Sequence, residues 1–114
     1  MAENANDILF RLEALLHERK RAAPGSSYVA TLYAKGLDAV LKKVGEEATE
    51  AILAAKGDDA AHLTREAADL LFHTLVMLAA KNVALADVLA ELARREGTSG
   101  LDEKKTRKAS SKES

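Results

Sequence analysis

The chain has 114 residues, a formal net charge of −1 and no cysteine. This length suits one domain with one core, and the missing cysteines exclude disulfides and thiolate metal sites. There is no basic excess to bind nucleic acid or an anionic membrane surface. The first ten residues lack the pattern of a secretory signal, and no run of about 18 apolar residues is present. We therefore expect a cytoplasmic protein with no membrane span.

Hydrophobic residues make up 47% of the chain and aromatic residues only 4%, a composition that favours helices because Ala and Leu lose little on entering one. Asn6 or Asp7 is a suitable cap for a first helix. The apolar residues of this helix recur at helical spacing: Ile8, Leu9, Leu12, Leu15 and Leu16. The Pro-Gly pair that follows ends it. A short helix is then predicted from Ser26 or Ser27 to near Gly36.

Longer helices complete a predicted all-α bundle of four to five helices: residues 37–56, 60–81 and 85–96. Gly57 stops the first of these, and Asp58 or Asp59 is a suitable cap for the second. Asn82 is suited to close the second in the left-handed conformation. We expect residues 1–96 to form a single helical domain, the catalytic one. Residues 97–114 have almost no apolar side chains, so we expect a mobile C-terminal tail.

The segment Asp69–Ala80 is apolar nearly all the way round, which is typical of a helix buried on most sides. A domain of a few short helices has difficulty covering such a helix alone. We therefore expect a homodimer that buries this segment between its subunits.

Carboxylates are crowded on the helix predicted over residues 37–56. Glu50 neighbours both Glu46 and Glu47, and like charges at this spacing destabilise a helix by about 0.2–0.5 kcal/mol per pair. The next helix carries Glu66 and Asp69 three positions apart. Because helices joined by a short connection usually pack as antiparallel neighbours, the Glu47/Glu50 and Glu66/Asp69 pairs can face each other.

Carboxylates that converge between packed helices need a counter-charge, which a divalent cation supplies. Oxygen ligands favour Mg²⁺ or Mn²⁺, and Mg²⁺ usually takes waters or substrate phosphates as its other ligands. We therefore predict a Mg²⁺ site for phosphate chemistry, in which Mn²⁺ can substitute. The competing interpretation is that each acidic pair is only a solvated helix face. Against it, Glu47 lies beside the apolar stripe that contains Val40 and Val44.

The pattern E-E-x-x-E followed by E-x-x-D resembles that of the all-α, MazG-like nucleoside triphosphate pyrophosphohydrolases. The wider sequence resembles the phosphoribosyl-ATP pyrophosphohydrolases (phosphoribosyl-ATP diphosphatases) of histidine biosynthesis. The stretches that carry this resemblance are SYVATLYAKGLDAVLKKVGEEATEAILAAK, EAADLLFHTLVMLA and GTSGLDEKK. Two segments depart from the family pattern. VALADV stands where the family usually has V-S-L-E-D-V, so Ala84 offers no cap, and EKKTRK replaces E-K-A-S-R.

The resemblance implies an intertwined homodimeric bundle that hydrolyses phosphoribosyl-ATP to phosphoribosyl-AMP and diphosphate with Mg²⁺. Its metal ligands fall on Glu47, Glu50, Glu66 and Asp69, and Glu46 is a further acidic member of the site. Glu46, Glu47 and Glu50 are the catalytic candidates, and the sequence leaves open which of them accepts the proton of the attacking water.

Other residues are candidates with two interpretations each. Lys43 either contacts a substrate phosphate or pairs with Glu47, and Lys56 either contacts a phosphate or only complements the helix dipole. Lys104 either closes over the polyanion or solvates the tail. His73 either orients a carboxylate or the substrate, or is a core residue.

Two further residues, Tyr28 and Gly45, also have two interpretations each. Tyr28 either touches the ribose or base of a nucleotide or belongs to the core. Gly45 costs a helix roughly 1 kcal/mol relative to alanine, which either close helix packing or room for a phosphate chain explains.

Two alternative functions stay open from the sequence. The first is a house-cleaning MazG-like nucleoside triphosphate pyrophosphohydrolase, against which the K-K-V-G and S-G-x-x-E-K strings weigh. The second is a helical dimerisation module without catalysis, whose melting temperature Mg²⁺ would leave unchanged.

Overall fold

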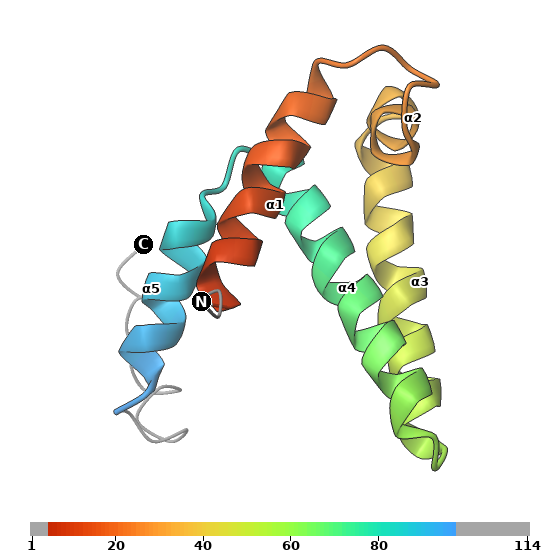
Figure 1. Ribbon diagram of the computed structural model, residues 1–114, viewed down its shortest axis with the longest axis vertical. Helices are drawn as coiled ribbons and strands as arrows, with labels where there is room; N and C mark the ends of the chain where they lie inside the picture. The colour runs from red at the N-terminus through yellow and green to blue at the C-terminus, as the bar shows by residue number, and fades with distance from the viewer. Residues whose placement is uncertain (1–4, 98–114) are drawn as a thin grey trace, which may run out of the picture.

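The computed structural model describes residues 5–97 of the chain. This part contains five helices and no strand, which confirms the predicted all-α class (Figure 1). Their bounds are α1 Ala5–Lys20, α2 Tyr28–Ala34, α3 Leu37–Lys56, α4 Ala60–Ala80 and α5 Leu85–Arg95. The predicted tail, residues 97–114, lies outside the described residues except for Gly97. None of the described helices is long and apolar enough to cross a membrane.

The helices form two arms that meet at an angle (Figure 1). α3 and α4 make the most extensive contact in the fold and form one arm as an antiparallel hairpin. α1 packs against α4 near the junction of the arms, and α5 follows α1 along the other arm. The short α2 joins α1 to α3 and contacts both. The outer part of the α3–α4 hairpin therefore extends away from the other helices.

The core lies where the arms meet. Its fully buried side chains come from different helices: Leu16, Val40 and Val76. Lys20 ties the end of α1 to the end of α4, because its ammonium donates to the Ala79 carbonyl at 2.7 Å and to Asn82 Oδ1 at 2.9 Å. Carbonyls at a helix C-terminus lack partners within the helix, so these contacts stabilise the junction.

Several predicted helix ends are confirmed. The Ser27 side chain caps α2 by accepting from the Ala30 N–H, and Asp59 caps α4 by accepting from the His62 N–H. Asn82 adopts the left-handed conformation after α4, with φ of 56°. The predicted start of α1 is wrong, because the helix already begins at Ala5 and so includes Asn6 and Asp7.

The burial of the apolar segment Asp69–Ala80 differs along its length. Its second half faces the core, with Leu75, Val76 and Ala79 buried. In its first half, Leu71 is 61% exposed. Residues 5–97 therefore cover only part of this segment, and burial between two subunits stays a prediction.

Candidate active site

The α3–α4 hairpin positions the acidic side chains. Gly57 ends α3 and Asp59 caps α4, so the helices reverse direction within a few residues and pack along their length. The inner face of α3 is apolar at Val40 and Ala54, which are buried, and Glu47 lies on the same face with an exposed fraction of only 9%. A carboxylate this buried needs a compensating positive charge.

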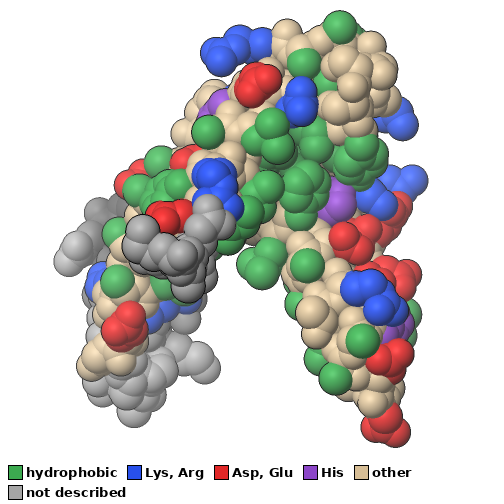
Figure 2. All heavy atoms as spheres, viewed as in Figure 1, with side chains coloured by type: hydrophobic (Ala, Val, Ile, Leu, Met, Phe, Trp, Pro, Cys, Tyr) green, Lys and Arg blue, Asp and Glu red, His purple; other side chains and the backbone are tan. Residues whose placement is uncertain are grey.

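Glu47 meets two carboxylates of α4. One carboxylate oxygen from each of Glu47, Glu66 and Asp69 can be chosen so that all lie within 4.8 Å of one another. In Figure 2, acidic side chains gather along the α3–α4 arm. The donors are all carboxylate oxygens, which suits a hard divalent cation such as Mg²⁺ or Mn²⁺. The residues present therefore fit the predicted type of metal.

Lys43 provides a positive charge beside this group. Its ammonium lies 3.1 Å from Glu47 Oε1 and 3.7 Å from Glu46 Oε2. The hydrogen bond to Glu47 raises the pKa of Lys43, so the lysine stays charged. Of the two interpretations of Lys43, the structure shows the pairing with Glu47. A phosphate contact remains compatible with it, because an ammonium has three donors.

Glu46 and Glu50 lie on α3 outside the three-carboxylate group, and both are exposed. The side chain of Glu46 is 49% exposed and approaches Lys43, whereas Glu50 lies one turn further along the helix. Their assignments, both as catalytic residues and Glu50 also as a metal ligand, stay predictions.

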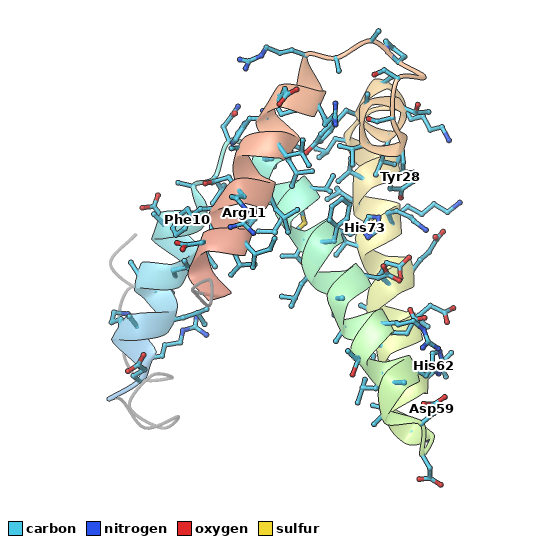
Figure 3. The ribbon with its side chains drawn as sticks, in the orientation of Figure 1. Phe10, Arg11, Tyr28, Asp59, His62 and His73 are labelled. Atoms are coloured by element: carbon cyan, nitrogen blue, oxygen red, sulfur yellow. The ribbon has the colours of Figure 1, made fainter. Side chains whose placement is uncertain are left out.

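His73 is buried at the α2 side of the acidic group, with an exposed fraction of 6%. Its Nδ1 lies 2.8 Å from the backbone carbonyl of Asp69, and its Nε2 lies 2.9 Å from the hydroxyl of Tyr28. A carbonyl oxygen only accepts hydrogen bonds, so Nδ1 carries the proton. With the ring proton on Nδ1 alone, Nε2 accepts from the Tyr28 hydroxyl. His73 thus links the site helix α4 to the start of α2, as Figure 3 shows.

His62 is a member of this region that sequence reasoning missed. Its Nε2 lies 3.5 Å from Glu66 Oε1, and its side chain is 43% exposed (Figure 3). The available signal was the spacing of His62 and Glu66, four positions apart on one helix.

The remaining candidates lie elsewhere. Lys56 is exposed in the last turn of α3, where the helix dipole favours any cation. Lys104 lies outside the described residues. A Cβ added at Gly45 meets nothing within 4 Å, so close packing inside the described part of the chain does not explain this glycine.

Comparison with known proteins gives a consistent result. Residues 9–96 match the family described as Phosphoribosyl-ATP pyrophosphohydrolase. The chain is similar to the phosphoribosyl-ATP pyrophosphatase of Azoarcus sp. (strain BH72), with 56% identity over 90% of this chain and 95% of the relative. It is 59% identical to that of Dinoroseobacter shibae, over 88% and 98% of the two chains. With that of Burkholderia cenocepacia it shares 51% identity over 99% and 97%.

Proposed function

The chain belongs to the phosphoribosyl-ATP pyrophosphohydrolase family, and we propose that it hydrolyses phosphoribosyl-ATP to phosphoribosyl-AMP and diphosphate, the second step of histidine biosynthesis. The observation that carries the proposal is the convergence of Glu47, Glu66 and Asp69 inside the matched segment. These carboxylates come from two helices, and Glu47 is buried on the face of α3 that also carries the buried Val40 and Ala54. That arrangement is expected of a cation site and not of a solvated helix face.

Glu47, Glu66 and Asp69 would hold the cation, with Glu50 as a further ligand and Mg²⁺ as the metal, for which Mn²⁺ can substitute. When bound, Mg²⁺ supplies positive charge that holds the phosphate chain and stabilises the leaving diphosphate. Lys43 offsets the negative charge of Glu47 in the absence of substrate and offers further N–H donors to a phosphate oxygen.

The proton of the attacking water needs an acceptor whose lone pairs are accessible. Glu46 and Glu50 are exposed and lie outside the three-carboxylate group, so they are better placed for this task than Glu47. Both are within reach of solvent on α3, next to the proposed position of the polyphosphate. We assign proton transfer to one of these two glutamates. Because Glu50 is also proposed as a metal ligand, the response to Mg²⁺ separates the two roles: Glu46→Gln should lose turnover but keep the rise in melting temperature with Mg²⁺, whereas Glu50→Gln should weaken that rise as well.

A homodimer completes the proposal. The α3–α4 arm exposes large apolar side chains, with Ile52 64%, Leu53 58% and Leu71 61% exposed. A cavity of about 360 Å³ also lies between α1 and α4, and its lining is apolar except for Asp69: Leu9, Leu12, Ala68, Asp69, Leu71, Phe72 and Leu75. Figure 2 shows hydrophobic side chains at the surface in the angle between the two arms. A second copy of the chain is the proposed cover for these surfaces.

One experiment tests the activity. The protein is incubated with Mg²⁺ and, separately, with phosphoribosyl-ATP, ATP or deoxynucleoside triphosphates, and diphosphate release is measured. We expect kcat/KM for phosphoribosyl-ATP to exceed that for every other nucleotide. Asp69→Asn should abolish the release, whereas the matched change Asp38→Asn, at an exposed position in the first turn of α3, should not. Comparable rates with deoxynucleoside triphosphates would instead support a house-cleaning enzyme.

A further inference from the structure

Tyr28 presents an aromatic ring to solvent while its polar tip is fixed. Tyr28 is the first residue of α2 and is 53% exposed, yet its hydroxyl is hydrogen-bonded to Nε2 of the buried His73 at 2.9 Å. The two rings meet edge to face, with centroids 5.8 Å apart and an interplanar angle of 81°. An exposed ring held at its tip has little rotational freedom left to lose, so it is a ready surface for stacking.

The anchor of this ring is itself fixed on two sides. His73 donates through Nδ1 to the Asp69 carbonyl, and Phe72 packs edge to face against it with centroids 5.3 Å apart. Because the Tyr28 hydroxyl donates its proton to His73, its remaining lone pairs can only accept. Tyr28 thus offers a ligand a flat apolar face and a hydrogen-bond acceptor at its edge.

The ring also lies next to the acidic group. His73 is one helical turn from Asp69, and Tyr28, at the start of α2, is hydrogen-bonded to His73 (Figure 3). Burial raises the pKa of Tyr28, while the nearby Lys43 charge lowers it and the Glu47 charge raises it. A ligand whose phosphates lie at the acidic group therefore places its adjoining part beside Tyr28.

We propose that Tyr28 contacts the nucleoside of the substrate, with its ring against the base, and that His73 is the positioning residue that holds this ring. The identity of the nucleotide rests on the proposed function, but the contact itself does not require catalysis. The cavity between α1 and α4 is a poorer candidate, because Asp69 is its only polar lining residue among those described. A base edge would find no other fixed polar partner there.

The test separates the nucleoside from the phosphates by using two probes, AMP and diphosphate, each as an inhibitor in the presence of Mg²⁺. Tyr28→Leu should weaken inhibition by AMP about ten-fold, as expected for the loss of one base–aromatic stack, and leave inhibition by diphosphate unchanged. KM for phosphoribosyl-ATP should rise by a similar factor with a much smaller change in kcat. Tyr28→Phe keeps the ring and should weaken inhibition by AMP less than Tyr28→Leu does.

Tyr33→Phe is the matched control. Tyr33 also belongs to α2 and also binds α4, by donating to the Val76 carbonyl at 2.9 Å, but its partner is a residue of the buried core. This change should leave inhibition by AMP and by diphosphate unchanged. Equal weakening of AMP and diphosphate in Tyr28→Leu would overturn the inference, because a distorted site would explain it. Unchanged AMP inhibition would overturn it as well. Failure of the wild type to hydrolyse phosphoribosyl-ATP would instead refute the proposed function.

Discussion

The carboxylate of Glu13 on α1 accepts a hydrogen bond from the backbone N–H of Leu85 at the start of α5, with Oε2 2.8 Å from the nitrogen. The N-terminal N–H groups of a helix lack partners inside the helix and carry partial positive charge. The N-cap residue of α5 is Ala84, whose side chain cannot accept a hydrogen bond. Glu13, 72 positions earlier in the chain, provides the missing partner.

Loss of this contact should destabilise the fold. We expect Glu13→Ala to lower the free energy of unfolding by about 1 kcal/mol, the usual cost of removing a helix cap. Urea denaturation followed by circular dichroism measures the change. Glu18→Ala, at an exposed position of the same helix, is the control and should have little effect.

A second change tests the cause. Ala84 has extended backbone angles, φ −72° and ψ 134°, which are those of a normal N-cap residue. Ala84→Ser in the Glu13→Ala background should therefore recover part of the lost stability, because the serine hydroxyl can cap the helix by accepting from the N–H of Ala86 or Asp87. If the serine restores nothing, Glu13 stabilises the protein by another route.

Local signals predicted most of the helices, and long-range contacts explain what they did not predict. The limits of α3 agree with its apolar spacing and with Gly57, because those features act within a few residues. The sequence showed that Ala84 offers no cap but could not show that Glu13 replaces it. That contact depends on how α1 and α5 pack side by side, which no periodicity encodes.

The candidate site was likewise predicted where local spacing determines it, and not where it depends on contacts between helices. The spacing of Glu66 and Asp69 predicted their shared face, and the apolar stripe predicted that Glu47 faces α4. Spacing alone did not separate Glu47 from Glu50. Positions three apart differ by about 60° around a helix, enough to leave Glu50 exposed while Glu47 is buried. The Tyr28–His73 bond joins different helices and was not predicted.

Asp69→Asn should abolish the response of the protein to Mg²⁺. A cation that binds only the folded state raises the melting temperature with its concentration. We expect this rise in the wild type and not in Asp69→Asn. Without Mg²⁺, the variant should melt no lower than the wild type, because the change relieves repulsion from Glu47 and Glu66.

Glu47→Gln is a less clean version of the same experiment. This variant also loses the ion pair to Lys43, whose atoms are 3.1 Å apart in the wild type. Its activity should disappear as in Asp69→Asn. Its stability without Mg²⁺ is subject to two opposing effects, the loss of the Lys43 ion pair and the relief of repulsion among the carboxylates. Near-normal turnover by either variant would refute the assignment of these carboxylates to the metal.

Gly45→Ala should stabilise helix α3 in the ligand-free protein. Glycine inside a helix costs roughly 0.5–1 kcal/mol relative to alanine, and an added Cβ at Gly45 meets nothing within 4 Å. We expect a rise of a few degrees in the melting temperature of the ligand-free protein. A fall would show that this surface is covered in the assembled protein.

Glu91 on α5 should titrate at unusually low pH. Hydrogen bonds from Arg94 and Arg95 lower the pKa of Glu91 from 4.5 to about 2. Stability linked to this contact is therefore fully present above pH 4.5 and is lost as the pH falls through about 2. Because the residues are exposed, the direct measurement is the carboxyl carbon chemical shift of Glu91. Removing either arginine should raise the measured pKa, and an unperturbed value in the wild type would contradict the contact.

The exposed apolar surface of the α3–α4 arm should hold two copies of the chain together. Leu71 is 61% exposed beside the cavity between α1 and α4, and fully burying a leucine contributes about 1.5–3 kcal/mol. We expect the wild type to sediment as a dimer at micromolar concentration. Leu71→Arg should raise the dimer dissociation constant at least ten-fold, since each subunit contributes the residue.

The control for this prediction is Ala86→Arg, which places the same charge at an exposed position in the first turn of α5, on the other arm. It should leave the dissociation constant nearly unchanged. A stable monomeric wild type would exclude the dimer. A dimer that tolerates Leu71→Arg would exclude the α3–α4 arm as its interface, because a buried arginine without a partner charge costs far more than an exposed one. Loss of the dimer only in Leu71→Arg therefore assigns the interface to this arm and explains the large apolar side chains that are exposed within residues 5–97.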